Sequence, residues 1–355
     1  MVRLLSLSQL NVRNLRTPRL EFPPGINAIV GRNAAGKSNL LEAVYLACTG
    51  EMAGARTVEL VRLGEEQGYV AAEVEHDEGV SEIEVGLAPG RKQIRIDKQA
   101  ARASDVARVV TAVLLTPEDA ELVHGPPSGR RGYLDGLLAR LSPRYGALTR
   151  EYHRVVEQRN ALLRMAPFDP SLEVWSERFL ALGSEIEELR GRALVRLAPL
   201  ACEVYAEIGG PAAPRLGVSL LRSHRFETLT EALADASEEE QARRLTVVGP
   251  HRDDLGLTLG GHSVQSYGSR GEARTAALAL RVAEYRLLDE KHREPPVLLM
   301  DDFTAELDES RRDYLLRLAA STPQALVTGT EPPPRFDRLL NVEAGLFSEG
   351  ALAHG

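Results

Sequence analysis

The chain has 355 residues, and its 43 Lys and Arg against 51 Asp and Glu give a net charge of −8. Hydrophobic residues make up 43% and charged residues 26%, the balance of a globular protein. The two cysteines exclude a disulfide framework and a Cys-based zinc site. No apolar run reaches the roughly eighteen residues of a membrane span, and the N-terminus lacks a signal-peptide pattern, so we expect a cytoplasmic protein without membrane contact. The length predicts two domains, or one domain with an insertion.

The first part of the chain predicts α/β structure. Residues 1–30 contain two strand patterns, and residues 38–49 carry apolar side chains at helical spacing. Residues 69–98 alternate apolar and polar side chains around the turn sequence at 88–91, which predicts a β-hairpin.

From about residue 118 the pattern becomes helical. Ser142-Pro143 is a typical helix start. The breaker at 167–170 separates this helix from a second one, in which apolar residues from Leu172 to Ala193 follow a heptad spacing. The sequence therefore predicts an antiparallel helical hairpin. Residues 121–200 hold 12 arginines, no lysine and 10 acidic residues, so this window is mildly basic within an acidic chain.

The last hundred residues return to α/β. A buried strand is predicted at 297–300, a helix at 308–320 and another short strand at 325–327.

A phosphate-binding loop lies between the second strand and the first helix. Its residues match G-x-x-x-x-G-K-[ST] and the position that follows it: Gly31, Arg32, Asn33, Ala34, Ala35, Gly36, Lys37, Ser38 and Asn39. The glycines let successive N–H groups point at phosphate oxygens, and the helix N-terminus adds positive potential. Lys37 supplies a charge to the β and γ phosphates, and Ser38 offers a hydroxyl to Mg²⁺. The sequence thus predicts ATP and Mg²⁺ as cofactors.

Two carboxylates end the strand at 297–300. Asp301 is predicted to hold Mg²⁺, and Asp302 to orient or deprotonate the attacking water. With Lys37, Asp302 is the predicted catalytic residue. A third motif, residues 266–274, opens a helix with small residues and predicts another anion site. Within it, Tyr267 is expected to pack the turn rather than stack on a base.

The order of these motifs resembles that of the ATP-binding-cassette ATPases. Further strings narrow the resemblance to the RecF family of DNA replication and repair proteins, in the SMC-like branch: 40–43, 116–119, 129–135, 249–254 and 301–308. The resemblance covers essentially the whole chain. It implies an α/β fold: an ABC-type ATPase domain with a mixed sheet, formed by residues 1–120 and 245–355, and a helical hairpin insertion domain at 121–244.

The resemblance also implies a nucleotide-controlled dimer. Ser269, Gly271 and Glu272 would form the signature motif, which contacts the γ-phosphate of ATP held by the partner, and Asp308 would cross the dimer interface. Arg270 and Glu272 stand where the family usually has glutamine, so Glu272 removes a donor and adds repulsion. Thr330 stands where transporter ATPases have a histidine.

The implied function is ATP-dependent DNA binding in recombinational repair. The dimer would bind double-stranded DNA near single-strand gaps and, with RecO- and RecR-like partners, promote recombinase loading. Asp302 replaces the glutamate of most cassette ATPases, which suggests slow ATP hydrolysis used as a switch. The resemblance also implies that DNA stimulates this hydrolysis. The alternatives are an SMC-type chromosome-organising clamp and a transporter ATPase subunit.

The DNA-contacting residues are expected among the arginines of the helical region, where guanidinium groups would clamp phosphates. The candidates are Arg130, Arg131, Arg154, Arg159, Arg190 and Arg192. His251 and Arg252 would touch nucleotide, DNA or the dimer partner, or else form a local salt-bridge network with Asp253 and Asp254.

Overall fold

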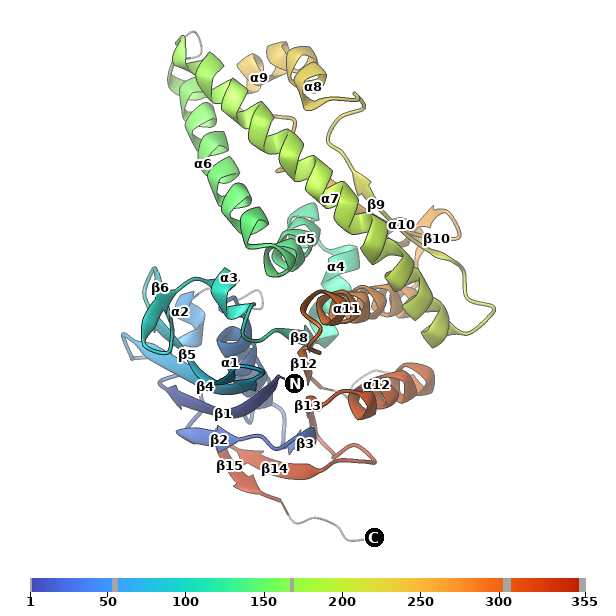
Figure 1. Ribbon diagram of the computed structural model, residues 1–355. Helices are drawn as coiled ribbons and strands as arrows, with labels where there is room; N and C mark the ends of the chain where they lie inside the picture. The colour runs from blue at the N-terminus through green and yellow to red at the C-terminus, as the bar shows by residue number, and fades with distance from the viewer. Residues whose placement is uncertain (1, 53–56, 167–168, 303–307, 351–355) are drawn as a thin grey trace. The chain divides into compact units, whose positions relative to one another are not determined.

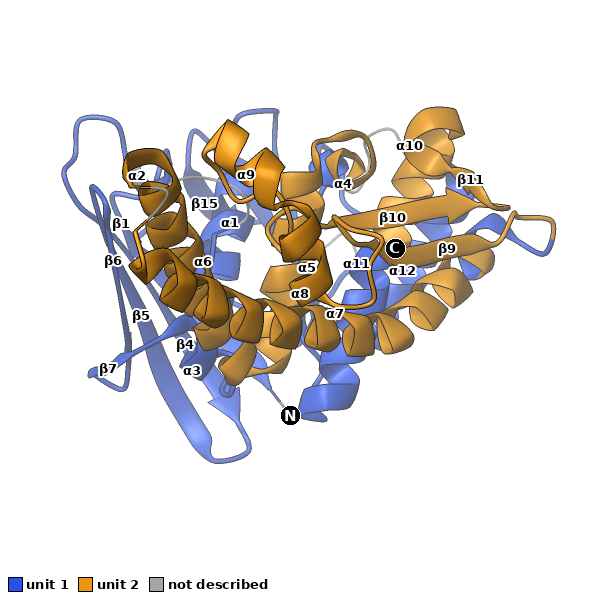
Figure 2. Ribbon diagram, turned by 90° about the horizontal axis from the view of Figure 1, so that it is seen from above, with its two compact units in different colours: residues 1–119, 207–211, 280–355 blue, residues 120–206, 212–279 orange. Residues whose placement is uncertain are grey.

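The computed structural model describes residues 2–52, 57–166, 169–302 and 308–350. The chain forms two compact units, coloured separately in Figure 2. Unit 1 comprises residues 1–119, 207–211 and 280–355, and unit 2 comprises residues 120–206 and 212–279.

An antiparallel sheet of six strands forms one layer of unit 1 (Figure 1). Its strands lie in the order β2 (Arg19–Glu21), β1 (Arg3–Leu10), β4 (Gly68–His76), β5 (Gly79–Ala88), β6 (Arg91–Ile96) and β7 (Gln99–Ala101). The hairpin predicted around residues 88–91 is present: Ala88 pairs with Arg91, and Pro89 and Gly90 form a two-residue turn between them. Gly90 has a φ of 68°, which glycine adopts without steric cost.

The second sheet of unit 1 is mixed and positions the nucleotide motifs. Its order is β15 (Leu346–Glu349), β14 (Arg338–Glu343), β3 (Gly25–Val30), β13 (Gln324–Gly329), β12 (Val297–Met300) and β8 (Ala112–Leu115). The strands from β14 to β8 are parallel, and β15 is antiparallel. β12 and β13 are buried along their whole length, as strands covered on both faces require.

Helix α1 (Lys37–Thr49) packs between the two sheets, because it contacts β4 and β5 on one side and β8, β12 and β13 on the other. Its residues Leu40, Leu41 and Val44 are fully buried in the core of unit 1. Unit 1 also contains α2 (Thr57–Leu60), α3 (Ala103–Val106), the 3₁₀-helix η1 (Pro117–Ala120), α12 (Glu309–Ser321) and the C-terminal part of α11 (Arg270–His292).

Unit 2 consists of helices and a small sheet. The helices are α4 (Glu121–His124), α5 (Pro127–Leu141), α6 (Pro143–Met165), α7 (Ser171–Gly209) except its last three residues, α8 (Leu229–Asp235), α9 (Ser237–Arg243), α10 (Val264–Tyr267) and the start of α11. The sheet is antiparallel, in the order β11 (His262–Ser263), β10 (Asp254–Leu259) and β9 (Leu216–Leu221).

The predicted helical hairpin is confirmed. Tyr152 of α6 stacks on Phe179 of α7 with ring centroids 5.5 Å apart, and Phe179, Leu182 and Ile186 of the heptad seam are buried. Ser142 occupies the N-cap position of α6, but its side chain makes no capping hydrogen bond. Helix α7 is longer than the heptad pattern indicated and runs through Pro199 to Gly209. Residues 167–168 of the predicted breaker lie outside the described residues.

The domain division differs from the predicted one at its second boundary. Residues 245–279, expected in the ATPase domain, belong to unit 2. The reason is that β10 pairs with β9, and Asp253 and Asp254 form ion pairs with Arg190 and Arg130 of the helical region.

Candidate nucleotide-binding site

The phosphate loop joins β3 to α1, as predicted. Gly36 is the N-cap of α1 and has a φ of 118°. Glycine adopts this backbone conformation without strain, whereas other residues are strained in it. Lys37 is 6% exposed, and its Nζ donates hydrogen bonds to the carbonyl oxygens of Gly31 at 2.7 Å and Arg32 at 3.0 Å. The ammonium group is therefore held inside the curve of the loop, where the expected phosphates would lie.

A polar cluster supports the loop from one side, and sequence reasoning missed two of its members, Arg13 and Asn14. Asn14 Nδ2 donates to the carbonyl oxygen of Ala34 at 3.2 Å, and Asn39 Nδ2 donates to Asn14 Oδ1 at 2.8 Å. Arg13 donates to Asn39 Oδ1 at 3.1 Å and pairs with Glu42 at 2.7 Å. Burial raises the pKa of Glu42, and Arg13 opposes this shift. The signal in the sequence was the change from apolar to polar residues where β1 ends.

A pocket of about 1040 Å³ opens beside this cluster in unit 1. Its lining includes Arg13, Asn14, Arg16, Ala34, Arg62 and Leu63. The lining is mixed, because several cationic and amide side chains stand beside a few apolar ones. Because Ala34 belongs to the phosphate loop, the pocket adjoins the place expected for the phosphates.

The two predicted carboxylates follow β12 at the same sheet edge as the phosphate loop. Parallel register aligns Met300 with Leu115 and Val327, and Gly329 with Val30, so the carboxyl ends of four neighbouring strands meet there. Ligands of open α/β sheets bind at this edge.

Thr328 of β13 connects the two aspartates. Its hydroxyl donates to Asp301 Oδ1 at 2.6 Å and accepts from the N–H of Asp302 at 2.9 Å. Asp302 has a φ of 48°, in the left-handed region that costs a non-glycine residue about 1 kcal/mol or more. Such strain clusters at functional positions, and here the Thr328 hydrogen bond helps to maintain it.

The residues present fit a magnesium ion. Carboxylate and hydroxyl oxygens, as on Asp301 and Ser38, are hard ligands that suit Mg²⁺. Within the described ranges, no group of three or more His, Cys, Asp or Glu side chains forms a metal cage. Mg²⁺ is usually bound by one or two protein groups together with substrate phosphates and waters, so this donor set is sufficient.

The predicted signature motif, in unit 2, forms a capping box at the start of α11. The N–H and Oγ of Ser269 each donate to Glu272 Oε2 at 2.8 Å, and the N–H of Glu272 donates back to Ser269 Oγ at 3.2 Å. The hydrogen bonds from Ser269 lower the pKa of Glu272. Tyr267 was expected to pack the turn. Instead it is 79% exposed and meets only the edge of His262 in the ring contacts of the described residues, with centroids 6.2 Å apart.

Asp308 is the N-cap of α12. It accepts hydrogen bonds from the N–H of Arg311 and the hydroxyl of Ser310, both at 3.0 Å. Burial alone would raise the pKa of Asp308, but these two bonds and the Arg311 charge lower it. Its side chain is 54% exposed, which leaves it accessible to a partner. Residues 303–307, the middle of the predicted 301–308 string, lie outside the described residues.

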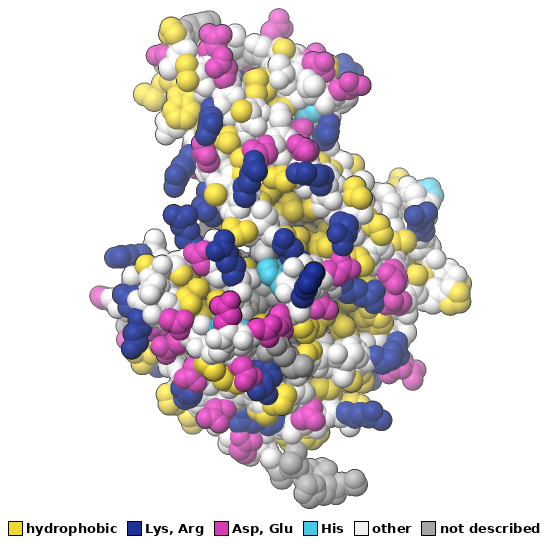
Figure 3. All heavy atoms as spheres, viewed as in Figure 1, with side chains coloured by type: hydrophobic (Ala, Val, Ile, Leu, Met, Phe, Trp, Pro, Cys, Tyr) yellow, Lys and Arg dark blue, Asp and Glu magenta, His cyan; other side chains and the backbone are white. Residues whose placement is uncertain are grey.

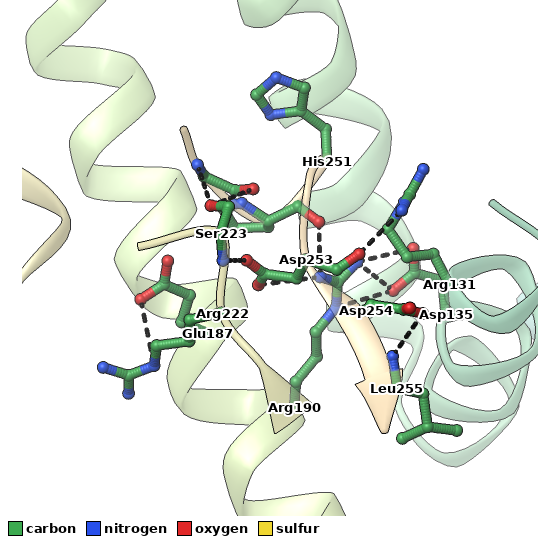
Figure 4. A network of polar contacts seen from close by, with 12 residues as sticks. Arg131, Asp135, Glu187, Arg190, Arg222, Ser223, His251, Asp253, Asp254 and Leu255 are labelled. Atoms are coloured by element: carbon green, nitrogen blue, oxygen red, sulfur yellow. Dashed lines mark hydrogen bonds and ion pairs between the residues drawn. The ribbon is translucent and has the colours of Figure 1, made fainter. Parts of the chain in front are cut away.

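Within the 249–254 string, Asp253 is fully buried and belongs to an internal polar network (Figure 4). Arg190 of α7 binds Asp135 at 2.9 Å, Asp253 at 3.4 Å and the carbonyl oxygen of Pro250 at 2.7 Å. Asp253 also accepts the N–H of Ser223 at 2.8 Å. The predicted local network of His251 and Arg252 with Asp253 and Asp254 is therefore wrong, because the two aspartates pair with Arg190 and Arg130 of the helical region.

The His251 ring points away from the internal polar network (Figure 4) and lies beside the rings of Tyr152 and Phe179. Its Nδ1 lies 2.8 Å from the hydroxyl of Tyr152 and its Nε2 lies 3.3 Å from the carbonyl oxygen of Thr246. Burial lowers the pKa of His251 to about 4, so the ring is neutral near pH 7. Arg252 lies at the surface and donates to the same Thr246 oxygen at 3.4 Å.

Three of the six predicted DNA-contacting arginines are wrong because they are buried. Arg130, Arg159 and Arg190 are 3%, 4% and 2% exposed. Arg130 pairs with Asp254 at 2.7 Å, and Arg159 pairs with Glu240 at 2.6 Å. A guanidinium group enclosed in this way satisfies an internal carboxylate and is not accessible to a phosphate.

The other three predicted arginines lie nearer the surface. Arg131 is half-buried and donates to the carbonyl oxygen of Asp253 at 2.8 Å. Arg192 is exposed and lies 3.7 Å from Glu188. Arg154 is exposed on α6.

The phosphate loop, the paired carboxylates and the mixed sheet define an ATPase domain of the class shared by RecF, RecN and SMC proteins. A family model described as the RecF/RecN/SMC N terminal domain matches residues 3–333. The chain is 52% identical to the DNA replication and repair protein RecF of Deinococcus radiodurans over 98% of this chain and 96% of that protein. It is 38% identical to RecF of Streptomyces avermitilis over 91% and 93% of the two chains. The chain belongs to the RecF family of DNA replication and repair proteins.

Solved structures agree with this assignment. The structure of the recombination mediator protein RecF with ATP, from the RecFOR pathway, matches with a TM-score of 0.91 and 30% identity over 99% of this chain and 98% of that one. The Smc head domain of Pyrococcus furiosus matches with a TM-score of 0.55 and 17% identity, which shows the shared fold alone. The likeness to RecF over the whole chain does not favour the SMC-type clamp or the transporter subunit. Within the described residues, every helix is too short or too polar to cross a membrane.

Proposed function

We propose that the protein binds ATP with Mg²⁺ at the phosphate loop and dimerises around the nucleotide. The observation that carries this proposal is the full-length likeness to a RecF structure that contains ATP, together with the enclosed Lys37 ammonium. Lys37 would contact the β and γ phosphates, and the pocket beside Ala34 would receive the nucleoside. The magnesium ion would be held by Ser38 and Asp301 and would neutralise phosphate charge.

Hydrolysis would be slow and would act as a switch. Asp302 would orient the attacking water, with its backbone held by Thr328. Ser269 and Gly271 of one protomer would contact the γ-phosphate held by the other, and Asp308 would cross the interface. Loss of the γ-phosphate would then weaken the joint between protomers.

The dimer would bind double-stranded DNA near single-strand gaps and promote recombinase loading with RecO- and RecR-like partners. This proposal is supported by family membership and by the pathway named for the ATP-bound relative. DNA binding would stimulate ATP hydrolysis. Because its ligand would be chromosomal DNA, its place of action would be the cytoplasm.

Sedimentation with ATP, with and without gapped DNA, tests the sandwich mechanism. Lys37→Met should abolish ATP binding and dimerisation, because it removes the only ammonium in the loop. Asp302→Asn should retain binding and accumulate the dimer. A monomeric Asp302→Asn protein in saturating ATP would contradict the proposal. An ATPase rate that gapped DNA leaves unchanged would contradict DNA stimulation.

A further inference from the structure

The exposed arginines of the hairpin divide into two groups according to whether a carboxylate neutralises them. Arg144 lies 2.5 Å from Glu185, Arg178 pairs with Glu151, and Arg192 lies 3.7 Å from Glu188. The net charge of each of these pairs is close to zero. A phosphate that bound such an arginine would have to compete with the carboxylate already beside it.

The second group lies on α6. Arg150, Arg154 and Arg164 are exposed, and none of them forms an ion pair or hydrogen bond with any residue that the structure describes. At 3.6 residues per turn, Arg154 and Arg164 lie about 40° to either side of Arg150. The three therefore share one narrow face, which we call the α6 stripe.

The α6 stripe points away from the core of unit 2. The opposite face of α6 carries buried side chains, among them Tyr152, Val155 and Leu163, and Tyr152 stacks on Phe179 of α7. Figure 3 shows Lys and Arg side chains gathered along the α6 side of this helical region. The stripe extends for roughly 20 Å, since α-helical residues rise 1.5 Å each. Duplex DNA carries about one charge per 1.7 Å of axis, so several phosphates lie within that length.

We propose that the α6 stripe, formed by Arg150, Arg154 and Arg164, is a contact surface for the phosphate backbone of duplex DNA. This inference rests on the proposed DNA-binding function and assigns it a location. The occupant follows from charge complementarity: guanidinium groups without internal carboxylates bind phosphate without first losing a partner. The buried arginines and the carboxylate-paired ones lack this property.

One acidic residue lies within the stripe. Glu157 is exposed and lies about 20° from Arg150 around the helix axis, by the same helical geometry. It faces the same solvent region and repels phosphate. Removal of its charge should therefore strengthen DNA binding, whereas removal of the stripe arginines should weaken it.

The experiment compares two triple variants of the full-length protein in binding to a short duplex with ATP present. The stripe variant carries Arg150→Gln, Arg154→Gln and Arg164→Gln, and the matched control carries Arg144→Gln, Arg178→Gln and Arg192→Gln. Both lose the same formal charge. Affinity is measured by fluorescence anisotropy over a range of salt concentrations, and thermal unfolding checks that both variants are folded.

A plot of log affinity against log salt concentration should have a shallower slope for the stripe variant than for the wild type. The slope should change by roughly 0.9 per lost phosphate contact, or roughly 2.7 in total. The control should retain a slope within about 1 of the wild type, and Glu157→Gln should bind more tightly. Equal slopes in the stripe variant and the wild type, or an equal loss in both triple variants, would overturn the inference. A wild-type protein with no affinity for duplex DNA would instead contradict the proposed function itself.

Discussion

The hydroxyl of Thr328 donates a hydrogen bond of 2.6 Å to the carboxylate of Asp301 while it accepts the N–H of Asp302 at 2.9 Å. One side chain thus orients the proposed magnesium ligand and holds the proposed catalytic residue in its left-handed conformation. The sequence analysis singled out Thr330, which follows β13, but Thr330 is exposed and Thr328 is the residue buried beside the aspartates.

Thr328→Val should lower the rate of ATP hydrolysis by about tenfold or more and leave ATP affinity within a few-fold. The variant keeps the shape of the side chain but leaves the Asp302 N–H without its acceptor, a loss of about 1–3 kcal/mol that favours a relaxed backbone. Turnover and equilibrium nucleotide binding are measured on the same preparation. Thr328→Ser, which retains the hydroxyl, should hydrolyse ATP at close to the wild-type rate. Wild-type turnover by a folded Thr328→Val protein would show that this contact does not position the site.

Glu272→Gln should tighten the ATP-driven dimer by roughly three- to tenfold, about 1 kcal/mol. In the free protein the Glu272 carboxylate occupies the N–H and Oγ of Ser269, the donors proposed to meet the partner's γ-phosphate. Glutamine also completes a capping box, so the helix start is retained while the negative charge is removed. Sedimentation in saturating ATP, in an Asp302→Asn background, reports the dimer constant.

Ser269→Ala provides the control for that experiment. It removes both the cap and the proposed phosphate contact, so it should weaken the dimer. Unchanged dimerisation in both variants would show that the start of α11 does not contact nucleotide.

The motifs of unit 1 were predictable because their chemistry is local. The phosphate loop needs glycine and lysine at fixed spacing after a strand, and the acid pair needs only to follow a buried strand. Parallel pairing then brings both to one sheet edge, whatever the connecting sequence. The support from Arg13 and Asn14 was not predictable in this way, because β1 approaches the loop through the packing of two sheets around α1.

The buried arginines were misassigned because charge alone suggested the surface. The helical spacing of apolar residues did indicate a buried position for one of these arginines. Arg159 lies on the same face of α6 as Tyr152, Val155 and Leu163, all buried, so its spacing indicated an internal partner. That partner, Glu240, lies 81 positions away in the sequence, beyond the reach of any local pattern.

Arg190→Met should destabilise unit 2 by about 3–5 kcal/mol, because it leaves Asp135 and Asp253 buried or partly buried without their cation. Arg192→Met, on the exposed face of the same helix, should change stability by no more than about 0.5 kcal/mol. Chemical denaturation followed by the fluorescence of Trp175, the single tryptophan, reports unit 2. If Arg190→Met kept wild-type stability but lost DNA affinity, Arg190 would be a phosphate contact after all.

His251 should make the stability of unit 2 depend on pH between its two pKa values. Burial lowers its folded pKa from 6.5 to about 4, while the unfolded chain keeps the ordinary value. The groups that face it are the Tyr152 hydroxyl, the Thr246 carbonyl, and the charges of Arg252, His153 and Arg131. Above the unfolded pKa neither state binds the proton. As the pH falls below it, the unfolded state binds the proton first, and stability is lost down to the folded pKa.

The loss attributable to His251 is on the order of 3 kcal/mol across that window. Aspartates and glutamates titrate in the same range, so the informative quantity is the difference between the wild type and His251→Gln. That difference is measured by denaturation followed by Trp175 fluorescence at about pH 7 and at about pH 4.5. These two pH values span most of the interval between the unfolded and folded pKa of His251. The stability advantage of the wild type should shrink as the pH falls, because only the wild type has the buried imidazole to protonate. A constant difference at both pH values would show that the His251 ring takes up its proton in the folded state at an ordinary pKa.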